Sequence, residues 1–443
     1  MSLLTITDYN NRGRNVDWKL TIASVVMSFM VFIRDLGIFM FTPVFFITVV
    51  TVFSIILSYK SVLRFFFFLI PFGCGVHGLI LVPLFLALVI KAGKMNVSQV
   101  IFTVAILIIE LVHFLFYPFP TSFSKYIIYG LNIALFFYVI FDDKENNEDV
   151  RENIRYYVLG TVVCLTLILV HSAAVFGVQA LFLGVYRIGG DDEEFVEMAG
   201  DVSMQITMNA NTVAYFSVTA IALMLYVKCV FHSRLGYAVS MILLVFAGAM
   251  STSRTWLMVT GLMLIIYFIF SKMKGKLWFV VATFLLFFAL YKFTIYTEAL
   301  FERFGARFTE NNLQTGGLRT ELFAEYNMFM RNNPRRIVFG TGAVYYKQIC
   351  NVWNSVHCGL QQIYVCYGLV GLLIYLTAGI MYYYKYPRVN KSTLWLCLPF
   401  FICLIFDQSI QFLNPPLLMM PFIASVLPMK LKQEIKSSSN KLQ

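Results

Sequence analysis

Runs of apolar residues, separated by short polar stretches, recur along the whole chain. Within each run the apolar residues are continuous instead of alternating with a period of two, which favours helices over the strands of a membrane barrel. A helix that crosses a bilayer needs about twenty apolar residues, and many of the runs approach that length. The runs fall at about 20–33, 38–58, 64–75, 76–90, 99–118, 124–141, 154–178, 207–228, 235–251, 255–271, 277–296, 359–384, 393–412 and 415–428.

Two parts of this pattern are ambiguous. The stretch 64–90 contains Pro71 and the sequence Gly73-Cys74-Gly75-Val76-His77-Gly78. It is either two short helices around a tight turn or one broken helix. The region around Asn414-Pro415-Pro416 has the same ambiguity. We therefore expect an all-α, polytopic membrane protein with 12–14 transmembrane segments.

The composition agrees with a membrane protein and excludes an ordinary soluble domain. Hydrophobic residues make up 59% of the 443 residues and charged residues only 13%, against about a quarter charged in soluble proteins. The net charge of +11 raises the question of nucleic acid. We exclude that partner because the chain has no contiguous basic run and because basic residues beside spans are first of all topology signals.

The placement of Lys and Arg predicts the orientation of the chain. With the N-terminus in the cytoplasm, most basic residues fall on the inner side, and the polar loops 179–206 and 297–357 fall outside, with Arg254 at the outer face. The expected organisation is a cytoplasmic N-terminus (1–19), transmembrane helices that include the first outer loop (20–296), a large extracytoplasmic loop (297–357), further transmembrane helices (358–428) and a cytoplasmic tail (429–443). The first span is expected to be retained, because the N-terminus lacks a cleavage site typical of a signal peptide.

The large loop carries a predicted amphipathic helix. Between Arg319 and Asn332 the apolar residues have helical spacing, and Asn333-Pro334 ends the helix. Arg319 shares a face with Phe323, Tyr326 and Met330. A loop arginine is often only a solvated charge. On the face that packs onto the membrane domain, however, it needs an anionic partner, and arginine suits phosphate.

Further candidates lie where spans meet the predicted outer face. Arg254 follows a link rich in Ser and Thr that includes Ser253, and together they offer an arrangement that could bind an anion. The alternative is an arginine that only reaches toward the interface. His357 stands at the start of a span and is either structural or a general base. Asn211 opens another span, where it is either a helix cap or a hydrogen-bond donor to a polar substrate.

The remaining polar residues carry weaker hypotheses. Glu110 and His113 have the spacing of a carboxylate-bridged metal site, but no second copy exists, so we favour a hydrogen-bonded pair that stabilises helix packing. Asp407 lies near the outer end of a late span and is a candidate because acids inside membranes are usually functional. Cys350 and Cys358 flank the end of the large loop, and whether they form a disulfide is left open.

Four motifs together resemble the O-antigen ligase/polymerase superfamily of bacterial surface-polysaccharide assembly. The chain resembles this family over about residues 186–385, and Cys358 departs from it, since the family often has Asn or Ser there. The motifs are Met208-Asn209-Ala210-Asn211-Thr212-Val213-Ala214, Ser251-Thr252-Ser253-Arg254, Gly316-Gly317-Leu318-Arg319 with the following Asn333-Pro334 and Phe339-Gly340-Thr341-Gly342 (read as a hairpin turn), and His357-Cys358-Gly359-Leu360-Gln361 with Tyr367-Gly368-Leu369-Val370-Gly371.

The resemblance implies a function and a site. It implies inverting glycosyl transfer from a polyprenyl-diphosphate-linked oligosaccharide on the outer face of the bacterial plasma membrane, without a metal or other cofactor, in a fold like the GT-C membrane glycosyltransferases. Arg254 and Arg319 would bind the donor diphosphate, with Arg187 and Arg303 as helpers. His357 would orient or deprotonate the acceptor hydroxyl. The implied partners are the lipid-linked glycan, the bilayer, and a flippase and chain-length regulator of the same pathway.

Three functional hypotheses follow. The first is a polymerase that joins lipid-linked repeat units, which we favour because sugar-specific polymerases vary most in sequence. The second is a ligase that moves a finished glycan to another acceptor with the same donor site. The third is a transporter or flippase, which would carry polar groups at broken helices near the membrane midplane.

Overall fold

The computed structural model of the chain describes residues 17–74, 78–116, 123–177, 210–226, 233–251, 253–270, 319–352, 356, 358–385 and 427–430. These residues form helices and no strands, as the continuous apolar runs predict. The α-helices are α1 (Trp18–Asp35), α2 (Pro43–Ile56), α3 (Tyr59–Leu69), α4 (Leu81–Ala92), α5 (Val97–Leu115), α6 (Phe123–Ile140), α7 (Asn147–Phe176), α10 (Ala210–Tyr226), α11 (Arg234–Met250), α12 (Arg254–Phe270), α16 (Arg319–Asn332), α17 (Pro334–Phe339), α18 (Tyr346–Cys350) and α19 (Gly359–Lys385). Short 3₁₀ turns are η1 (Pro71–Cys74), η2 (Gly78–Ile80) and η3 (Pro428–Lys430).

Side-chain caps determine where several helices begin. Asn96 and Gln99 form a capping box at the start of α5, and Asn146 and Asp149 form another at the start of α7. Each box satisfies backbone N–H groups that have no partner within the helix. Thr42 caps α2 ahead of Pro43, whose fixed φ suits the first helical position. The apolar run 38–58 therefore yields a helix that starts five residues later than the run.

Three described helices are long and apolar enough to cross a membrane: α5, α7 as far as Ala174, and α19. The expected 12–14 spans do not appear at full length in the described residues, because most of the other apolar helices are shorter. For example, α2 has 14 residues, or roughly 21 Å at 1.5 Å per residue, against a hydrocarbon core of about 30 Å. Many large apolar side chains of α1, α2 and α5 are exposed, as lipid contact would require.

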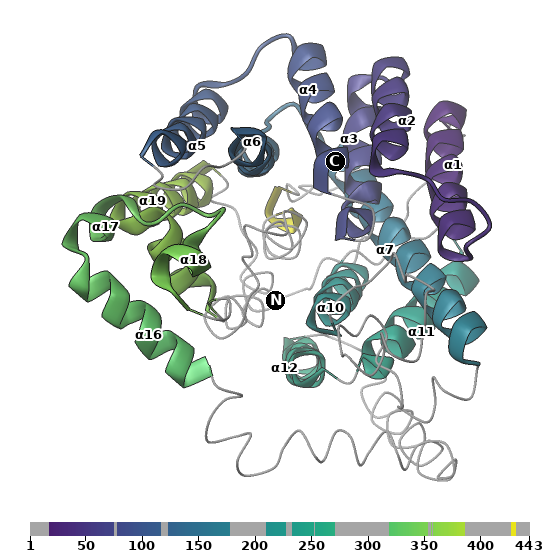
Figure 1. Ribbon diagram of the computed structural model, residues 1–443. Helices are drawn as coiled ribbons and strands as arrows, with labels where there is room; N and C mark the ends of the chain where they lie inside the picture. Colours follow the sequence, from purple (N-terminus) through teal and green to yellow (C-terminus); the bar gives the residue numbers. More distant parts are fainter. Residues whose placement is uncertain are drawn as a thin grey trace, which may run out of the picture.

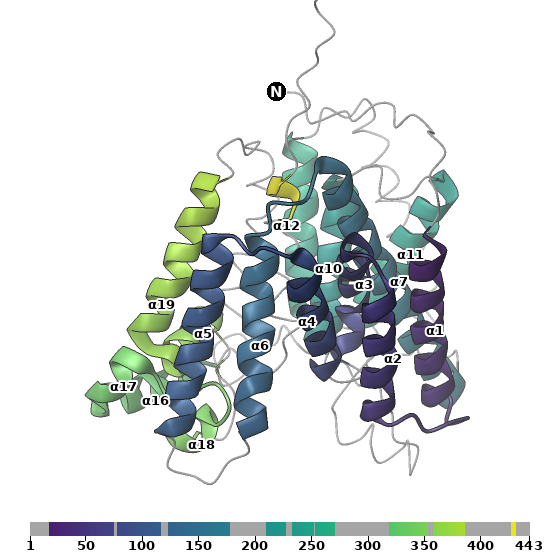
Figure 2. The ribbon, with the colours of Figure 1, turned by 90° about the horizontal axis from the view of Figure 1, so that it is seen from above.

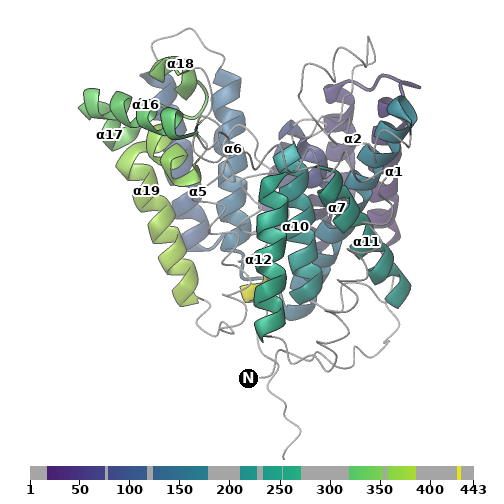
Figure 3. The same ribbon diagram turned by 90° about the horizontal axis from the view of Figure 1, so that it is seen from below.

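The helices run side by side in a bundle, and α16, α17 and α18 lie at one end of it (Figures 1 and 3). The helices α5, α6 and α19 form one side, whereas α1, α2, α3, α7, α10, α11 and α12 form the other (Figure 1). Between them α4 contacts both α6 and α2. We call the end with α16–α18 the loop end. It also contains the turn between α11 and α12 (Figure 3).

At the opposite end of the bundle, which includes η3 (Figure 2), lysines join the helix ends to one another, and we call it the basic end. Lys91 Nζ donates to the carbonyls of Ile55 and Leu57, and Lys144 Nζ to that of Ala92. Lys385 Nζ donates to the carbonyl of Phe141 at 3.0 Å. These lysines are among the residues that the charge pattern assigns to the cytoplasmic side. Their assignment to one face of a membrane stays a prediction.

Lys430 adds a buried connection at the basic end. Its side chain is 3% exposed, and its Nζ lies 2.9 Å from the carbonyl oxygen of Val139, 3.1 Å from that of Asp142 and 2.5 Å from a carboxylate oxygen of Glu145. Burial raises the pKa of the Glu145 carboxyl, and the positive charge of Lys430 partly opposes that rise. Both charged groups are compensated inside the protein, so removal of either partner would leave the other buried without compensation.

The ambiguous stretch 64–90 is two short helices. After α3 the chain makes the 3₁₀ turns η1 and η2 and then returns as α4, which contacts α3. Because α3 has 11 residues, it is roughly 17 Å long, which is about half the thickness of a hydrocarbon core. Lys91 at the end of α4 donates to Leu57, just ahead of α3, so the pair begins and ends at the basic end.

Candidate functional site

The helices α10, α11 and α12 form one half of the candidate site, and Trp256 binds them together. The indole Nε1–H of Trp256 donates to Ser217 Oγ of α10 at 3.2 Å, and Ser217 Oγ donates to the carbonyl of Leu244 in α11 at 2.7 Å. The ring lies against Gly248 so closely that a Cβ there would collide with it. This buried chain of hydrogen bonds fixes the first turn of α12, which begins two residues earlier at Arg254.

The turn between α11 and α12 is built from buried serines. Ser251 Oγ donates to the carbonyl of Gly248 at 2.6 Å, and the backbone N–H of Ser253 lies 3.4 Å from Ser251 Oγ. Ser253, a predicted substrate-binding residue, is only 1% exposed. Hydroxyls placed within reach of backbone groups make a tight turn of defined shape. Arg254 therefore starts α12 directly after the buried Ser253, at the loop end (Figure 3).

The second half of the candidate site is α16, whose predicted bounds are confirmed. The helix runs from Arg319 to Asn332, and the side chain of Asn333 donates back to the carbonyl of Phe329 at 2.8 Å. Its buried face contains Leu322, Tyr326 and Met330. The prediction that Phe323 belongs to this face is wrong, since that side chain is 48% exposed.

By position, Arg319 still belongs to the buried face of α16 once Phe323 is replaced by Leu322 on that face. Arg319 precedes Leu322 by three positions and Tyr326 by seven, which are positions on one helical face. The aromatic ring of Tyr326 lies 5.8 Å from that of Tyr346 in α18, and burial raises the pKa of the Tyr326 phenol.

Gln361 joins α16 to the first turn of α19. Its Nε2 donates to the carbonyl of Phe323 at 2.9 Å and lies 3.3 Å from Asn327 Oδ1. Gln361 lies in the first turn of α19, so α16 packs beside the start of that helix, whereas His357 lies outside the described residues. Of the residues just ahead of α19, Val356 is buried and Cys358 is half-buried.

The segment Gly340–Gly342 docks onto a break in α19 instead of forming a hairpin. Gly368 has φ +63°, which interrupts the helix. The backbone N–H groups of Thr341 and Gly342 donate to the carbonyls of Val365 and Cys366, each at 2.8 Å. A helix break leaves carbonyls without their usual partners, and this segment satisfies two of them. The hairpin prediction is wrong because the backbone of this segment pairs with the interrupted part of α19, which is distant in the sequence, and not with a neighbouring strand.

Glu110 and His113 of α5 hold the contact between α17 and the break in α19 in place. The Tyr367 hydroxyl donates to Glu110 Oε1, and His113 Nε2 lies 2.7 Å from the carbonyl oxygen of Phe339. The predicted direct hydrogen bond between the two side chains is therefore wrong, although both do stabilise helix packing. In the described residues no group of three His, Cys, Asp or Glu could hold a metal ion.

The structure locates only part of the predicted site. Arg254 begins α12, Arg319 begins α16 and Asn211 is the second residue of α10, but the side chains of these three residues lie outside the described part. The predicted residues that fall outside the described residues altogether are Arg187, Arg303, His357 and Asp407. The first turn of α12 is joined to the middle of α10 through the hydrogen bond from Trp256 to Ser217.

Sequence reasoning did not single out several residues that position these helices. Trp256, Ser217 and Gly248 lie in apolar runs, where each can be explained as an ordinary core residue. One signal was available, because a Trp and a Ser buried in a span usually find hydrogen-bond partners. Gln361 gave a similar signal as an amide in the first turn of an apolar helix.

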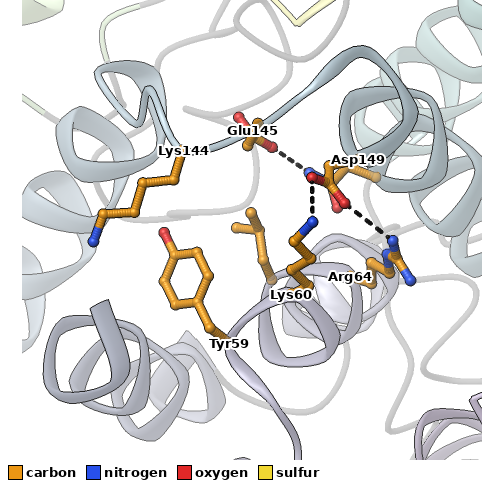
Figure 4. Close-up of a pocket in the computed structure, with 8 residues that line it drawn as sticks. Tyr59, Lys60, Arg64, Lys144, Glu145 and Asp149 are labelled. Atoms are coloured by element: carbon orange, nitrogen blue, oxygen red, sulfur yellow. Dashed lines mark hydrogen bonds and ion pairs between the residues drawn. The ribbon is translucent and has the colours of Figure 1, made fainter. Parts of the chain in front are cut away.

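A pocket within the described residues lies elsewhere, at the basic end (Figure 4). It is filled by an ion-pair network: Asp149 accepts from Lys60 Nζ at 2.8 Å and from Arg64 at 3.3 Å. Glu145 accepts from the side-chain amide of Asn153. The charges in this pocket largely compensate one another, so its geometry fits structural support of the α3–α7 contact better than ligand binding.

Both cysteines at the end of the large loop are free thiols, so they form no disulfide. Cys350 is buried in α18, whereas Cys358 is half-buried ahead of α19. Burial raises the pKa of the Cys350 thiol to about 12, and the nearby charge of Arg336 partly opposes the rise. A thiol that keeps its proton is a poor nucleophile, so Cys350 acts as a core residue.

No family model, no curated protein and no solved structure matches this chain. The class that the fold defines is therefore an all-helical protein with three candidate membrane-spanning helices among its described residues.

Proposed function

We propose that the protein is a membrane glycosyltransferase that polymerises polyprenyl-diphosphate-linked oligosaccharide repeat units on the outer face of the bacterial plasma membrane. In this proposal Arg254 and Arg319 bind the diphosphate of the donor, with Arg187, Arg303, Ser253 and Asn211 around it. His357 accepts the proton of the attacking hydroxyl. The loop end of the bundle faces away from the cytoplasm.

One observation carries the proposal: the first turns of α12 and α16, each of which begins with one of the two arginines, lie at the same end of the bundle. The N-terminal end of α16 is the end directed toward α12 (Figures 1 and 3). Helix N-termini carry partial positive charge and bind phosphate groups. Two such termini with two arginines suit a diphosphate.

The proposed chemistry needs what these residues supply. The acceptor hydroxyl attacks the anomeric carbon of the donor sugar, the bond from that carbon to the diphosphate oxygen breaks, and the configuration inverts. Negative charge grows on the departing diphosphate, where the two guanidinium groups would stabilise it. His357 takes the proton from the hydroxyl as the new bond forms. The rigid serine turn and the Trp256 hydrogen bonds would keep Arg254 in place during the reaction.

Polymerase and ligase share this donor site, so we keep the ligase as the alternative, with transfer of a finished glycan to another acceptor. Deletion of the gene followed by analysis of the surface glycan separates them. Single repeat units on the lipid carrier indicate a polymerase, whereas full-length unattached chains indicate a ligase. Complementation with Arg254→Ala, Arg319→Ala and His357→Ala tests the site, and full complementation by all three would contradict it.

A transporter or flippase is the second candidate, and two breaks in helices favour it. The α3–α4 pair turns back about halfway through the bundle, and α19 is interrupted at Gly368. Discontinuous helices of this kind often form substrate sites in transporters. Repeat units confined to the cytoplasmic leaflet after gene deletion would support this function and contradict both transferase hypotheses.

A further inference from the structure

Three arginines at the corner between α16 and α17 lack acidic partners in the described part of the structure. Arg331 lies in the last turn of α16, and Arg335 and Arg336 follow Pro334 in the first turn of α17. Arg331 and Arg335 are exposed and Arg336 is half-buried. Within the described ranges none of the three side chains forms an ion pair or a hydrogen bond. At the basic end, by contrast, Lys60, Lys385 and Lys430 are each bonded to a carboxylate.

Exposed apolar side chains lie one turn further along α17. Val338 is 42% exposed and Phe339 is 53% exposed, although both belong to a helix that packs on α19. Phe339 is joined to α5 through the 2.7 Å contact between its carbonyl oxygen and His113 Nε2. On α5, Leu115, two residues after His113, is 65% exposed. Exposed apolar side chains therefore occur both on α17 and at the end of α5, the candidate membrane span that α17 contacts through His113.

The position of α17 matches the boundary of a bilayer. It lies beside the end of α5 and against the break in α19, at the edge of the bundle (Figures 1 and 2). The apolar sequence of α5 ends with Leu115 and Phe116, close to His113, which contacts α17. An element that exposes apolar side chains on one turn and arginines on the next is typical of the interfacial region, where lipid tails meet phosphate headgroups.

We propose that the corner formed by Arg331, Arg335 and Arg336 with Val338 and Phe339 is an interfacial anchor that binds anionic lipid headgroups. Val338 and Phe339 insert among the acyl chains beside α5, and the three guanidinium groups contact lipid phosphates. This anchor would fix the height of α16 above the membrane. The inference requires only that α5 spans a bilayer, and it is independent of the proposed transfer reaction.

The first experiment measures lipid binding by the full-length protein in detergent. Short-chain phosphatidylglycerol is titrated, with phosphatidylcholine of the same chain length as the neutral comparison, and the thermal midpoint is followed. The variant Arg331→Gln/Arg335→Gln/Arg336→Gln should bind phosphatidylglycerol at least about tenfold more weakly, since each basic residue near an anionic surface contributes about fivefold. The variant with three Lys substitutions should keep most of the affinity. Lys94→Gln, an exposed charge outside the corner, should leave it unchanged.

The second experiment locates the corner in a bilayer. The variant Phe339→Trp is reconstituted into vesicles of phosphatidylcholine brominated on the acyl chains, and its extra fluorescence relative to the parent protein is compared with that in unbrominated vesicles. We expect quenching of the introduced indole. An unchanged phosphatidylglycerol affinity in the triple Gln variant would overturn the role in phosphate binding. An unquenched indole would overturn the interfacial placement and favour contact with a second protein.

Discussion

Gly340 lies so close to the backbone of Cys366 that any side chain at position 340 would collide with the Cys366 carbonyl group. Gly368, two residues after Cys366, makes the reciprocal approach to the carbonyl of Val338. Both glycines have positive φ, at +76° and +63°. The contact between α17 and the break in α19 therefore depends on two backbone positions that only glycine satisfies on both grounds.

Replacement of Gly340 by Ala should destabilise the protein strongly. Positive φ alone costs a residue with a Cβ about 1 kcal/mol, and displacement of the Cys366 backbone should bring the total to roughly 3 kcal/mol or more. Gly93→Ala is a matched control, because Gly93 has φ +70° and nothing within 4 Å of an added Cβ. Thermal midpoints of the two variants in detergent should differ clearly. Equal losses would contradict the tight contact.

The hydrogen bond from Tyr367 to Glu110 should contribute to stability as a buried pair. Tyr367→Phe removes the donor and leaves a buried carboxyl oxygen without a partner, which costs about 1–3 kcal/mol. Glu110→Gln retains a carbonyl oxygen that can accept from the tyrosine, so its cost should be smaller. Tyr384→Phe, at a side chain that is 73% exposed, serves as the control. A larger loss in Glu110→Gln than in Tyr367→Phe would argue against this pairing.

Cys350 should make stability fall at high pH. The pKa of a thiol is ordinarily near 9, and burial raises that of Cys350 to about 12. The folded protein therefore keeps a proton that the unfolded chain loses between these values, so the stabilisation present below pH 9 decreases as the pH rises toward 12. Cys350→Ala should remove this part of the pH dependence.

Thiol alkylation offers a second measurement on the same residues. With the folded protein near neutral pH, the half-buried Cys358 should react first and Cys350 only after unfolding, as peptide mapping by mass spectrometry would show. Rapid modification of Cys350 in the folded protein would contradict its burial.

Displacement of Trp256 should reduce glycan polymerisation without any change to the proposed catalytic residues. Gly248→Ala places a methyl group where the indole lies, and Trp256→Phe removes the hydrogen bond to Ser217. Each should cost about 1–2 kcal/mol in stability and shorten the surface glycan in a complemented strain, because the first turn of α12 moves. Leu257→Ala, at an exposed neighbour in α12, is the comparison that should retain full length. Normal glycan in all three variants would separate α12 from the activity.

The helices themselves were predictable from the sequence, because each apolar run on described residues corresponds to one helix. Their ends were predictable where a local signal exists. Asn333-Pro334 marked the end of α16 because proline cannot continue a helix. The number of full spans was not predictable, since a cap such as Thr42 shortens a helix within a longer apolar run.

Tertiary contacts explain the remaining errors. Helical periodicity placed Phe323 on the buried face of α16, but the side chain that is buried there is that of the preceding residue, Leu322. The break at Gly368 is hidden in a continuous apolar sequence, and only the docking of Thr341 and Gly342 shows why it is stable. Of the candidate site, the sequence could indicate which helix starts carry arginine, whereas the Trp256 and Gln361 contacts that orient those starts required the fold.

The buried contact of Lys430 has a consequence for the order of synthesis. Its partner Glu145 lies 285 residues earlier in the chain. While the ribosome is still producing α10 to α19, the loop between α6 and α7 exists without the cation that neutralises it. The basic end can therefore reach its final form only after almost the whole chain has been translated.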